Sequence, residues 1–272
     1  MKKISGIILF LVTTFALGAC GNGDAAESND QLAAIKESGV LKVATSADYA
    51  PFEFHTIVDG KDQIVGSDID LAKAIADELG VKLELSDMSF NTVLASLKEG
   101  KVDVAISAIS ATAERKEQFD FTDNYYNPPQ VLVINKKDEN MFTSIDRLAG
   151  KSLGAQKGSI QEAVINEQIK EAKVVTIDKV PNMVIEINQG SLDGMVVEQT
   201  IAEAYIAQNP NLMIADIPLE QSDDEAFAVA LPKGSTELQE ELNKIIKKLS
   251  DEGKIDEFIK KNHELAEQTA TE

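Results

Sequence analysis

The sequence predicts an α/β protein built as two lobes with a ligand cleft between them. From residue 40, short apolar segments typical of strands alternate with segments whose apolar residues have helical spacing. The second half of the chain repeats this order, which indicates a second, similar unit. Pro128 and Pro129 force an extended crossing between the units. Residues 226–231 are expected to run back as a second crossing strand, and a cleft between two such lobes is a natural ligand site.

The first unit contains residues that are typical of helix starts and helix ends. Asp68 can cap a helix that ends at Gly80, because glycine readily adopts the left-handed conformation found after helices. A second helix is expected from about Asn91 to Gly100. The strands expected in this unit are 41–45, 81–85 and 102–109.

The second unit shows the same kinds of signals. Ser159 and Glu162 have the spacing of a capping box, which should open a helix. Pro181 favours the first turn of another helix, and Gly190 its end. The strands expected here are 153–156, 174–178 and 192–197, and the closing helices begin at Ser235 and about Lys254.

The amino terminus has the pattern of a secretory signal followed by a lipid attachment site. Behind two lysines, residues 4–19 form an uncharged apolar run that is shorter than the ~20 residues of a membrane-spanning helix. Cys20, the only cysteine, follows Leu-Gly-Ala, which resembles the lipobox of bacterial lipoproteins. We expect residues 1–19 to be removed, Cys20 to carry diacylglyceryl, and residues 20–30, small and acidic, to form a flexible tether. The alternative for Cys20 is an ordinary buried thiol.

The remaining chain has the composition of a soluble globular protein. We expect residues 31–126 and 227–272 to form one lobe and residues 128–224 the other. A net charge of -20 without a basic cluster argues against nucleic-acid binding. Only two histidines, His55 and His263, are present and they are far apart in sequence, so a histidine-based metal site or catalytic pair has little support.

Five segments in series resemble those of polar amino-acid binding proteins that feed ABC importers. They are DYAPFEF (48–54), GSDIDLAKAIADELG (66–80), KVDVAISAISATAERKEQFDFTDNYY (101–126), GAQKGSIQ (154–161) and GSLDGMVVEQTIAEAY (190–205). This resemblance implies a type II periplasmic-binding-protein fold that closes on a polar L-amino acid without a metal, a cofactor or catalysis. It also implies an ABC transporter permease as partner, a monomer, and lipid anchoring at the extracellular face of the cell membrane, in a Gram-positive cell.

By the same resemblance, Arg115 binds the α-carboxylate of the ligand, because a guanidinium offers two parallel donors to a carboxylate. The alternative is a solvated helix arginine among charged neighbours. The residues implied to assist Arg115 are Ser107, Ser110, Thr112, Gly158 and Ser159. Glu198 stands where the family usually has an aspartate for the α-ammonium group, so the charge is kept on a longer side chain.

The residues expected around the ligand side chain do not identify a single amino acid. Tyr49 and Phe90 match the aromatic positions that sandwich the ligand, and such rings accept aliphatic and cationic groups. Asp48 and Glu53 could face a cation such as arginine. Two other positions argue against a cationic ligand. Ser46 replaces an aspartate of similar basic-amino-acid binders, and Gln156 could favour glutamine or an acidic ligand.

Two alternative functions fit the same fold. One is an enzyme similar to cyclohexadienyl dehydratases, which would need a positioned general acid in the cleft. The other is a surface sensor or adhesin that uses a captured amino acid as a signal. We expect a binding receptor, because the sequence contains no convincing second catalytic group beside the glutamates.

Overall fold

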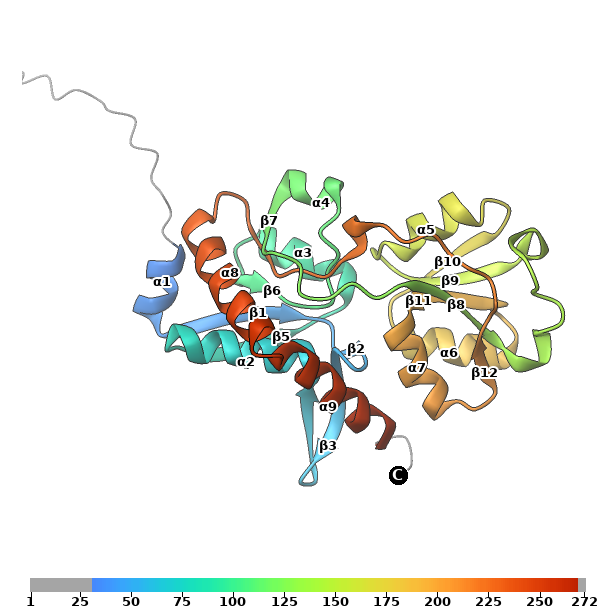
Figure 1. Ribbon diagram of the computed structural model, residues 1–272, viewed down its shortest axis with the longest axis horizontal. Helices are drawn as coiled ribbons and strands as arrows, with labels where there is room; N and C mark the ends of the chain where they lie inside the picture. The colour runs from blue at the N-terminus through green and yellow to red at the C-terminus, as the bar shows by residue number, and fades with distance from the viewer. Residues whose placement is uncertain (1–30, 269–272) are drawn as a thin grey trace, which may run out of the picture.

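The protein is described from a computed structural model, which covers residues 31–268. The signal peptide, Cys20 and the tether lie outside the described residues, so those expectations are untested. Figure 1 shows two lobes side by side, each with helices around its own sheet, and two extended segments running between them. The predicted α/β, two-lobed architecture is therefore confirmed.

The first lobe contains a five-stranded sheet with the order β5-β1-β6-β13-β7. Strands β5, β1 and β6 are parallel, whereas β13 is antiparallel to both β6 and β7. The bounds are β1 (Val40–Thr45), β5 (Lys82–Asp87), β6 (Val104–Ala105), β7 (Phe119–Phe121) and β13 (Ala230–Pro232). Because β13 follows the return segment, the sheet of the first lobe includes a strand from the C-terminal part of the chain.

The second lobe contains a sheet of the same design, with the order β10-β9-β11-β8-β12. Its strands β10, β9 and β11 are parallel, and β8 is antiparallel to β11 and β12. The bounds are β8 (Gln130–Asn135), β9 (Ser152–Gln156), β10 (Lys173–Ile177), β11 (Gly194–Glu198) and β12 (Leu212–Ile214). In each sheet, one antiparallel strand is therefore the one that arrives from the other lobe.

The two crossing segments are joined to each other. The backbone N–H of Phe227 donates to the carbonyl of Tyr126 at 2.7 Å, and the Tyr125 N–H donates to the Phe227 carbonyl at 2.9 Å. The Phe227 ring is fully buried and meets the Phe52 ring edge-on, with 5.2 Å between centroids. The expected return strand is therefore confirmed. The two crossing segments are hydrogen-bonded to each other and connect the two lobes.

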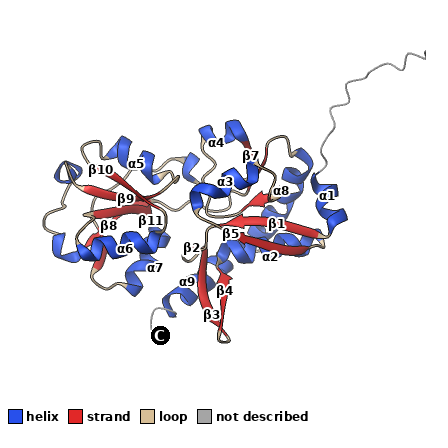
Figure 2. Ribbon diagram, turned by 180° about the vertical axis from the view of Figure 1, so that it is seen from behind, coloured by secondary structure: helices blue, strands red, loops and turns tan. Residues whose placement is uncertain are grey.

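A small antiparallel sheet, which the sequence did not predict, projects from the first lobe (Figure 2). It consists of β2 (Asp48–Tyr49), β3 (Glu53–Val58) and β4 (Lys61–Val65). Beyond β4 the chain turns at Gly66, whose φ of 136° and packing favour glycine, since a Cβ there would lie 1.9 Å from the Phe52 carbonyl oxygen. This tight approach fixes β3 against the start of the next helix.

Helices cover both sheets and bury an aliphatic core in each lobe. In the first lobe, fully buried Leu41 and Val43 belong to one cluster with Ile75 and Leu242; in the second, Leu132 and Leu153 belong to another. The helices are α1 (Gln31–Ser38), α2 (Ser67–Leu79), α3 (Phe90–Lys98), α4 (Ala113–Gln118), α5 (Gln161–Gln168), α6 (Val180–Gln189), α7 (Gln199–Gln208), α8 (Thr236–Asp251) and α9 (Lys254–Gln268). Short 3-10 turns are η1 (Lys136–Asp138), η2 (Ile145–Leu148) and η3 (Asp223–Glu225). Helix α9 contacts α2 and α8 and also reaches α7 of the second lobe.

Helix ends marked by glycine and proline follow the predictions. Gly80 and Gly190 end α2 and α6 in the left-handed conformation, with φ of 72° and 83°. Pro181 lies in the first turn of α6. Ser235 precedes α8, as expected, and α9 begins at Lys254.

Three local predictions were wrong. Asp68 does not cap α2: Gly66 holds the cap position, and the Asp68 carboxylate is buried and accepts from the Ala108 N–H. The expected strand 102–109 is reduced to β6, because the chain leaves the sheet and Ala108 takes a φ of 47°. The third concerns the start of α5.

The predicted capping box at the start of α5 is absent. The N-cap position is Ile160, and Ser159 makes no capping hydrogen bond. Glu162 instead accepts from the backbone N–H of Gly158 at 2.6 Å. The acidic side chain thus stabilises the loop before the helix, and the Ser159 hydroxyl is left for the cleft.

Candidate ligand-binding site

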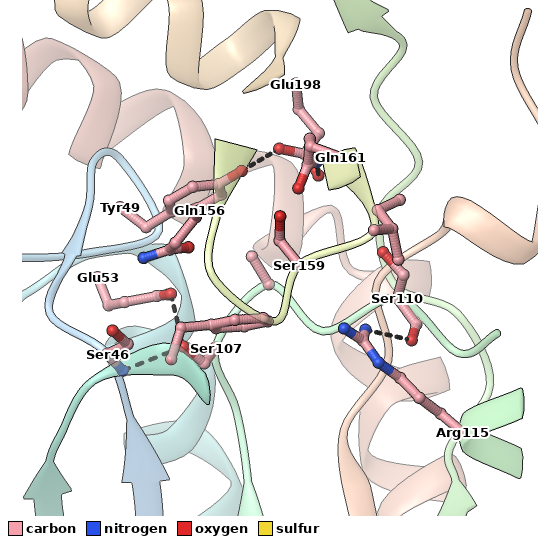
Figure 3. A pocket seen from close by; sticks show the side chains of 13 residues that line it. Ser46, Tyr49, Glu53, Ser107, Ser110, Arg115, Gln156, Ser159, Gln161 and Glu198 are labelled. Atoms are coloured by element: carbon pink, nitrogen blue, oxygen red, sulfur yellow. Dashed lines mark hydrogen bonds between the residues drawn. The ribbon is translucent and has the colours of Figure 1, made fainter. Parts of the chain in front are cut away.

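A small pocket lies between the lobes, at the strand ends that face the cleft. Figure 3 shows polar groups from both lobes converging on it. The lining residues are Ser46, Tyr49, Glu53, Phe90, Ser107, Ala108, Ser110, Arg115, Gln156, Ser159, Ile160, Gln161 and Glu198.

Arg115 is held at the pocket by backbone groups from both lobes. It lies in the first turn of α4, where the Thr112 hydroxyl caps the helix by accepting from the Arg115 N–H at 3.2 Å. Its Nη1 donates to the Ser110 carbonyl at 2.9 Å, and its Nη2 to the Gly158 carbonyl at 3.1 Å. The guanidinium carbon lies 5.8 Å from the centroid of the Phe90 ring. Burial lowers the pKa of Arg115 to about 10, so the positive charge remains at neutral pH.

Glu198 is the acidic group of the second lobe. It ends β11, is 2% exposed, and accepts through Oε1 from Gln161 Nε2 at 2.8 Å and from Gln130 Nε2 at 3.4 Å. Its Oε2 accepts from the Tyr49 hydroxyl across the cleft. Burial raises the pKa of Glu198, and these hydrogen bonds, led by that of Tyr49, oppose the rise. Two amides and a phenol therefore hold a buried carboxylate in place.

The first lobe also brings a buried acid to the pocket. Glu53, on β3, is 1% exposed, and its Oε1 accepts from the Ser107 hydroxyl at 2.9 Å. The Ser107 oxygen in turn accepts from the Ser46 N–H at 3.0 Å. Burial and then the charge of Asp68 raise the pKa of Glu53 well above its usual value. This wall of the pocket can accept hydrogen bonds or a positive charge.

Asp48 lies behind the pocket and not in its lining. Its Oδ1 accepts from Gln156 Nε2 of the second lobe at 2.9 Å, and its backbone carbonyl accepts from the Tyr205 hydroxyl at 2.9 Å. Burial raises the pKa of Asp48 to about 6. Asp48 thus contributes to contact between the lobes.

The structure brings most of the predicted residues together. Ten of them line the pocket: Ser46, Tyr49, Glu53, Phe90, Ser107, Ser110, Arg115, Gln156, Ser159 and Glu198. Thr112 and Gly158 line an adjoining groove and act on the pocket through Arg115. The Ser159 hydroxyl is buried without a hydrogen-bond partner among residues 31–268, so it is a candidate donor to a ligand.

Three lining residues were not predicted: Ala108, Ile160 and Gln161. Gln161 stands in the quoted segment GAQKGSIQ, and its position beside a helix start resembles that of many surface amides. Its burial, at 2% exposure, becomes evident only once Glu198 is placed beside it.

Neither a metal-binding cluster nor a membrane-spanning helix is present among the described residues. Among residues 31–268, no group of three or more His, Cys, Asp or Glu side chains is placed to hold a metal ion. Within the same range, no helix combines the length and the apolar character needed to cross a membrane.

Comparisons with known proteins agree with this geometry. The chain is 37% identical to the arginine-binding extracellular protein ArtP of Bacillus subtilis, over 96% of this chain and 98% of ArtP. It is 30% identical to the glutamine-binding protein GlnH of the same organism, over 96% and 97%. A crystal structure of the substrate-binding protein AbpA of Streptococcus pneumoniae bound to L-arginine is 45% identical, with a TM-score of 0.83 over 86% of this chain and 98% of AbpA.

The family match extends across nearly all of the described chain. Residues 41–264 match the bacterial extracellular solute-binding proteins, family 3. These are binding proteins, and the dehydratase alternative is not retained. The protein belongs to the bacterial extracellular solute-binding proteins of family 3.

Proposed function

We propose that this protein captures L-arginine and delivers it to an ABC importer. The proposal rests on the charged side chains that line the pocket. They are one cation, Arg115, and two acids, Glu53 and Glu198. A zwitterion needs both of its charges paired when it leaves water. Arg115 and Glu198 suffice for the α-carboxylate and α-ammonium groups, so Glu53 remains for a cationic side chain.

The α-carboxylate end is supported by unused donors beside Arg115. The Ser159 hydroxyl, buried and unpaired among the described residues, can donate to it, as can the Ser110 hydroxyl. On the opposite wall, the ligand ammonium would replace the Tyr49 hydroxyl as the donor to Glu198. Each group of the zwitterion backbone then exchanges water for a charged partner.

The side-chain end suits a long cationic group. Tyr49 and Phe90 offer aromatic faces to an aliphatic stem, and Glu53 with Ser46 lies at the same wall. The names of similar proteins support arginine, since ArtP and AbpA are both described with it. The similarity to GlnH makes glutamine the second candidate, and Gln156 is the residue that favours it.

A thermal-shift panel on the protein without residues 1–20 tests the ligand. Arginine should give the largest shift, followed by lysine and ornithine, whereas citrulline, a neutral analogue of arginine, should give little. Ligand at ~100 times its dissociation constant adds about 2.7 kcal/mol, which corresponds to roughly 5 to 11 °C for a chain of this length. A shift with glutamine alone would replace the cationic assignment by the neutral one. No shift with any amino acid would overturn both.

The cellular part of the proposal rests on the sequence pattern. Cys20 carries the lipid, residues 20–30 tether a monomer to the extracellular face of the cell membrane, and lobes 31–126 with 227–272 and 128–224 close on the ligand before docking to the permease. Labelled palmitate should be incorporated into the unmodified chain and not into Cys20→Ala. Loss of arginine uptake in a deletion strain would support transport, and unchanged uptake would favour a sensor or adhesin.

A further inference from the structure

Gln156, at the end of β9, is held by two acceptor atoms outside the pocket. Its Nε2 donates to Asp48 Oδ1 of the first lobe at 2.9 Å and to the Asp178 carbonyl oxygen at 3.4 Å. Gln156 and Asp48 are 3% and 7% exposed, so little water competes for these bonds. Gln156 also lines the pocket, whereas Asp48 lies behind it.

These two partners fix which end of the amide enters the pocket. A carbonyl oxygen and an ionised carboxylate accept hydrogen bonds but cannot donate them, so only the NH₂ group of Gln156 can face them. Burial raises the pKa of Asp48 only to about 6, so this carboxylate is ionised at pH 8. With both N–H bonds used, Oε1 is the atom of Gln156 that remains for a ligand. Figure 3 shows the amide nitrogen turned away from Ser159 and the oxygen turned toward it.

Asp48 is itself held in place by contacts from both lobes. Its backbone N–H donates to the Ser46 carbonyl at 2.7 Å, and its carbonyl accepts from the Tyr205 hydroxyl of the second lobe at 2.9 Å. As part of β2 it pairs with Phe54 of β3. The Asp48 carboxylate therefore has a defined place against Gln156.

The side-chain end of the pocket thus presents acceptors. Glu53 lines it, with Oε2 unpaired among the described residues, and Gln156 adds its carbonyl oxygen. A guanidinium carries five N–H donors and no acceptor, which matches these oxygens. A carboxylate side chain would meet like charge, and the carbonyl of a urea or amide gains no donor from Gln156.

We propose that Asp48 is a specificity-determining residue that acts through Gln156: it holds the amide with its oxygen toward the ligand, which selects side chains rich in N–H donors. The inference rests on the proposed binding of arginine. Because Asp48 does not line the pocket, its effect passes through the orientation of the amide. Gln156 could favour an acidic ligand only through its NH₂ group, which Asp48 holds away.

Calorimetry of L-arginine at pH 8 with two substitutions of Asp48 separates the hydrogen bond from the charge. Asp48→Asn loses the charge, but its amide oxygen can still accept from Gln156, whereas Asp48→Leu loses both at a similar size. Arginine affinity should fall by less than about threefold in the first and by roughly tenfold in the second, the size expected for one hydrogen bond. Asp77→Asn, at an exposed position of α2, should leave affinity unchanged. If Asp48→Leu does not fold, Asp48→Ala removes the same groups.

Gln156→Met tests whether the effect passes through the amide. In that background Asp48→Leu should cause no further loss of arginine affinity, because no amide remains to be oriented. Competition by citrulline, whose urea replaces the guanidinium, gives a second readout. The preference for arginine over citrulline should fall roughly tenfold in Asp48→Leu, where the amide can turn, and change by less than about threefold in Asp48→Asn.

The outcomes separate the two proposals. Absence of arginine binding by the unsubstituted protein overturns the proposed function and this inference with it. Arginine binding with equal losses in Asp48→Asn and Asp48→Leu overturns the inference alone, because charge is then the cause. A loss that persists beside Gln156→Met also overturns it, as do equal losses for arginine and citrulline, which would reflect closure of the lobes. Citrulline that competes with no variant overturns it too, since the released amide would then serve no carbonyl group.

Discussion

The two lobes share one sheet design but contribute different chemistry to the pocket. Both sheets have parallel strands on one side and an antiparallel crossing strand on the other, in corresponding orders. The first lobe brings Arg115 and the buried acid Glu53. The second brings Glu198, held by amide side chains. A repeated scaffold thus supplies the cleft, and residues at the ends of its strands and helices supply recognition.

The difference lies in what surrounds each charge. Glu198 is held by neutral donors, Gln161, Gln130 and Tyr49. Among the described residues, Glu53 accepts from the Ser107 hydroxyl alone, and burial followed by the charge of Asp68 raises its pKa well above its usual value. We therefore expect the second lobe to bind the ammonium group, and the first lobe to bind the carboxylate through Arg115 and the ligand side chain through Glu53.

The largest effect is expected from Arg115→Ala in the first lobe. It removes the partner of the ligand carboxylate and should lower arginine affinity by about 3 to 5 kcal/mol, since it leaves a buried charge unpaired. Arg147→Ala, the matched change at the exposed second arginine of the chain, should leave affinity unchanged. Calorimetry measures both. Equal affinities for the two variants would remove Arg115 from the site.

The corresponding change in the second lobe is Glu198→Gln. The glutamine keeps the shape and some hydrogen bonds but loses the charge opposite the ammonium group, so affinity should fall by about 1.5 to 3 kcal/mol. Glu203→Gln, at an exposed position on the following helix, is the control. If both glutamine variants bind arginine equally well, the assignment of the ammonium group to the second lobe is wrong.

Asp48→Asn tests whether a buried carboxylate of the first lobe lowers the stability of the folded protein. The pKa of Asp48 is raised to about 6, so the folded state binds its proton more tightly than the unfolded state. The free energy of unfolding should therefore increase as pH falls from about 6 to about 4. At pH 7 the variant should be more stable by about 1 to 2 kcal/mol, an advantage that vanishes near pH 4.

Urea denaturation at both pH values measures this stability difference. Asp216→Asn, at an exposed position of the second lobe, should change stability by less than about 0.5 kcal/mol at either pH. A gain for Asp48→Asn that is the same at pH 4 and pH 7 would show that desolvation of the carboxylate is not its cause.

Phe90→Leu should have the smallest effect. It removes the aromatic face near the Arg115 guanidinium and the ligand stem, and should weaken arginine binding by about 0.5 to 1 kcal/mol. Phe142, whose ring lies 5.2 Å from Lys151 Nζ in the second lobe, provides a comparable pair away from the pocket. Phe142→Leu should alter stability and leave the affinity of the folded protein unchanged; a similar loss of affinity would implicate folding in both cases.

Local signals in the sequence predicted the scaffold well. An apolar segment located β1, alternating apolar residues located β5, and Gly80 and Gly190 ended their helices as predicted. The hairpin from β3 to β4 was missed, because its second strand begins with the polar residues Lys61, Asp62 and Gln63.

The wrong predictions share a physical cause, which is contact between distant segments. Asp68 has the local sequence of a helix cap, yet it bonds to Ala108, 40 residues away. The expected strand at 102–109 ends early in the same region, where Ala108 has a positive φ and its N–H donates to Asp68. Likewise, Gln161 meets Glu198 only after the second lobe has folded, so no local pattern marks it as part of the pocket.

A crystal structure of the protein grown with L-arginine would test this division of roles most directly. We expect the ligand between the lobes, with its carboxylate on Arg115, its ammonium group on Glu198 and its guanidinium beside Glu53. A ligand bound with its guanidinium toward the second lobe, or bound outside this pocket, would contradict the division of roles between the lobes.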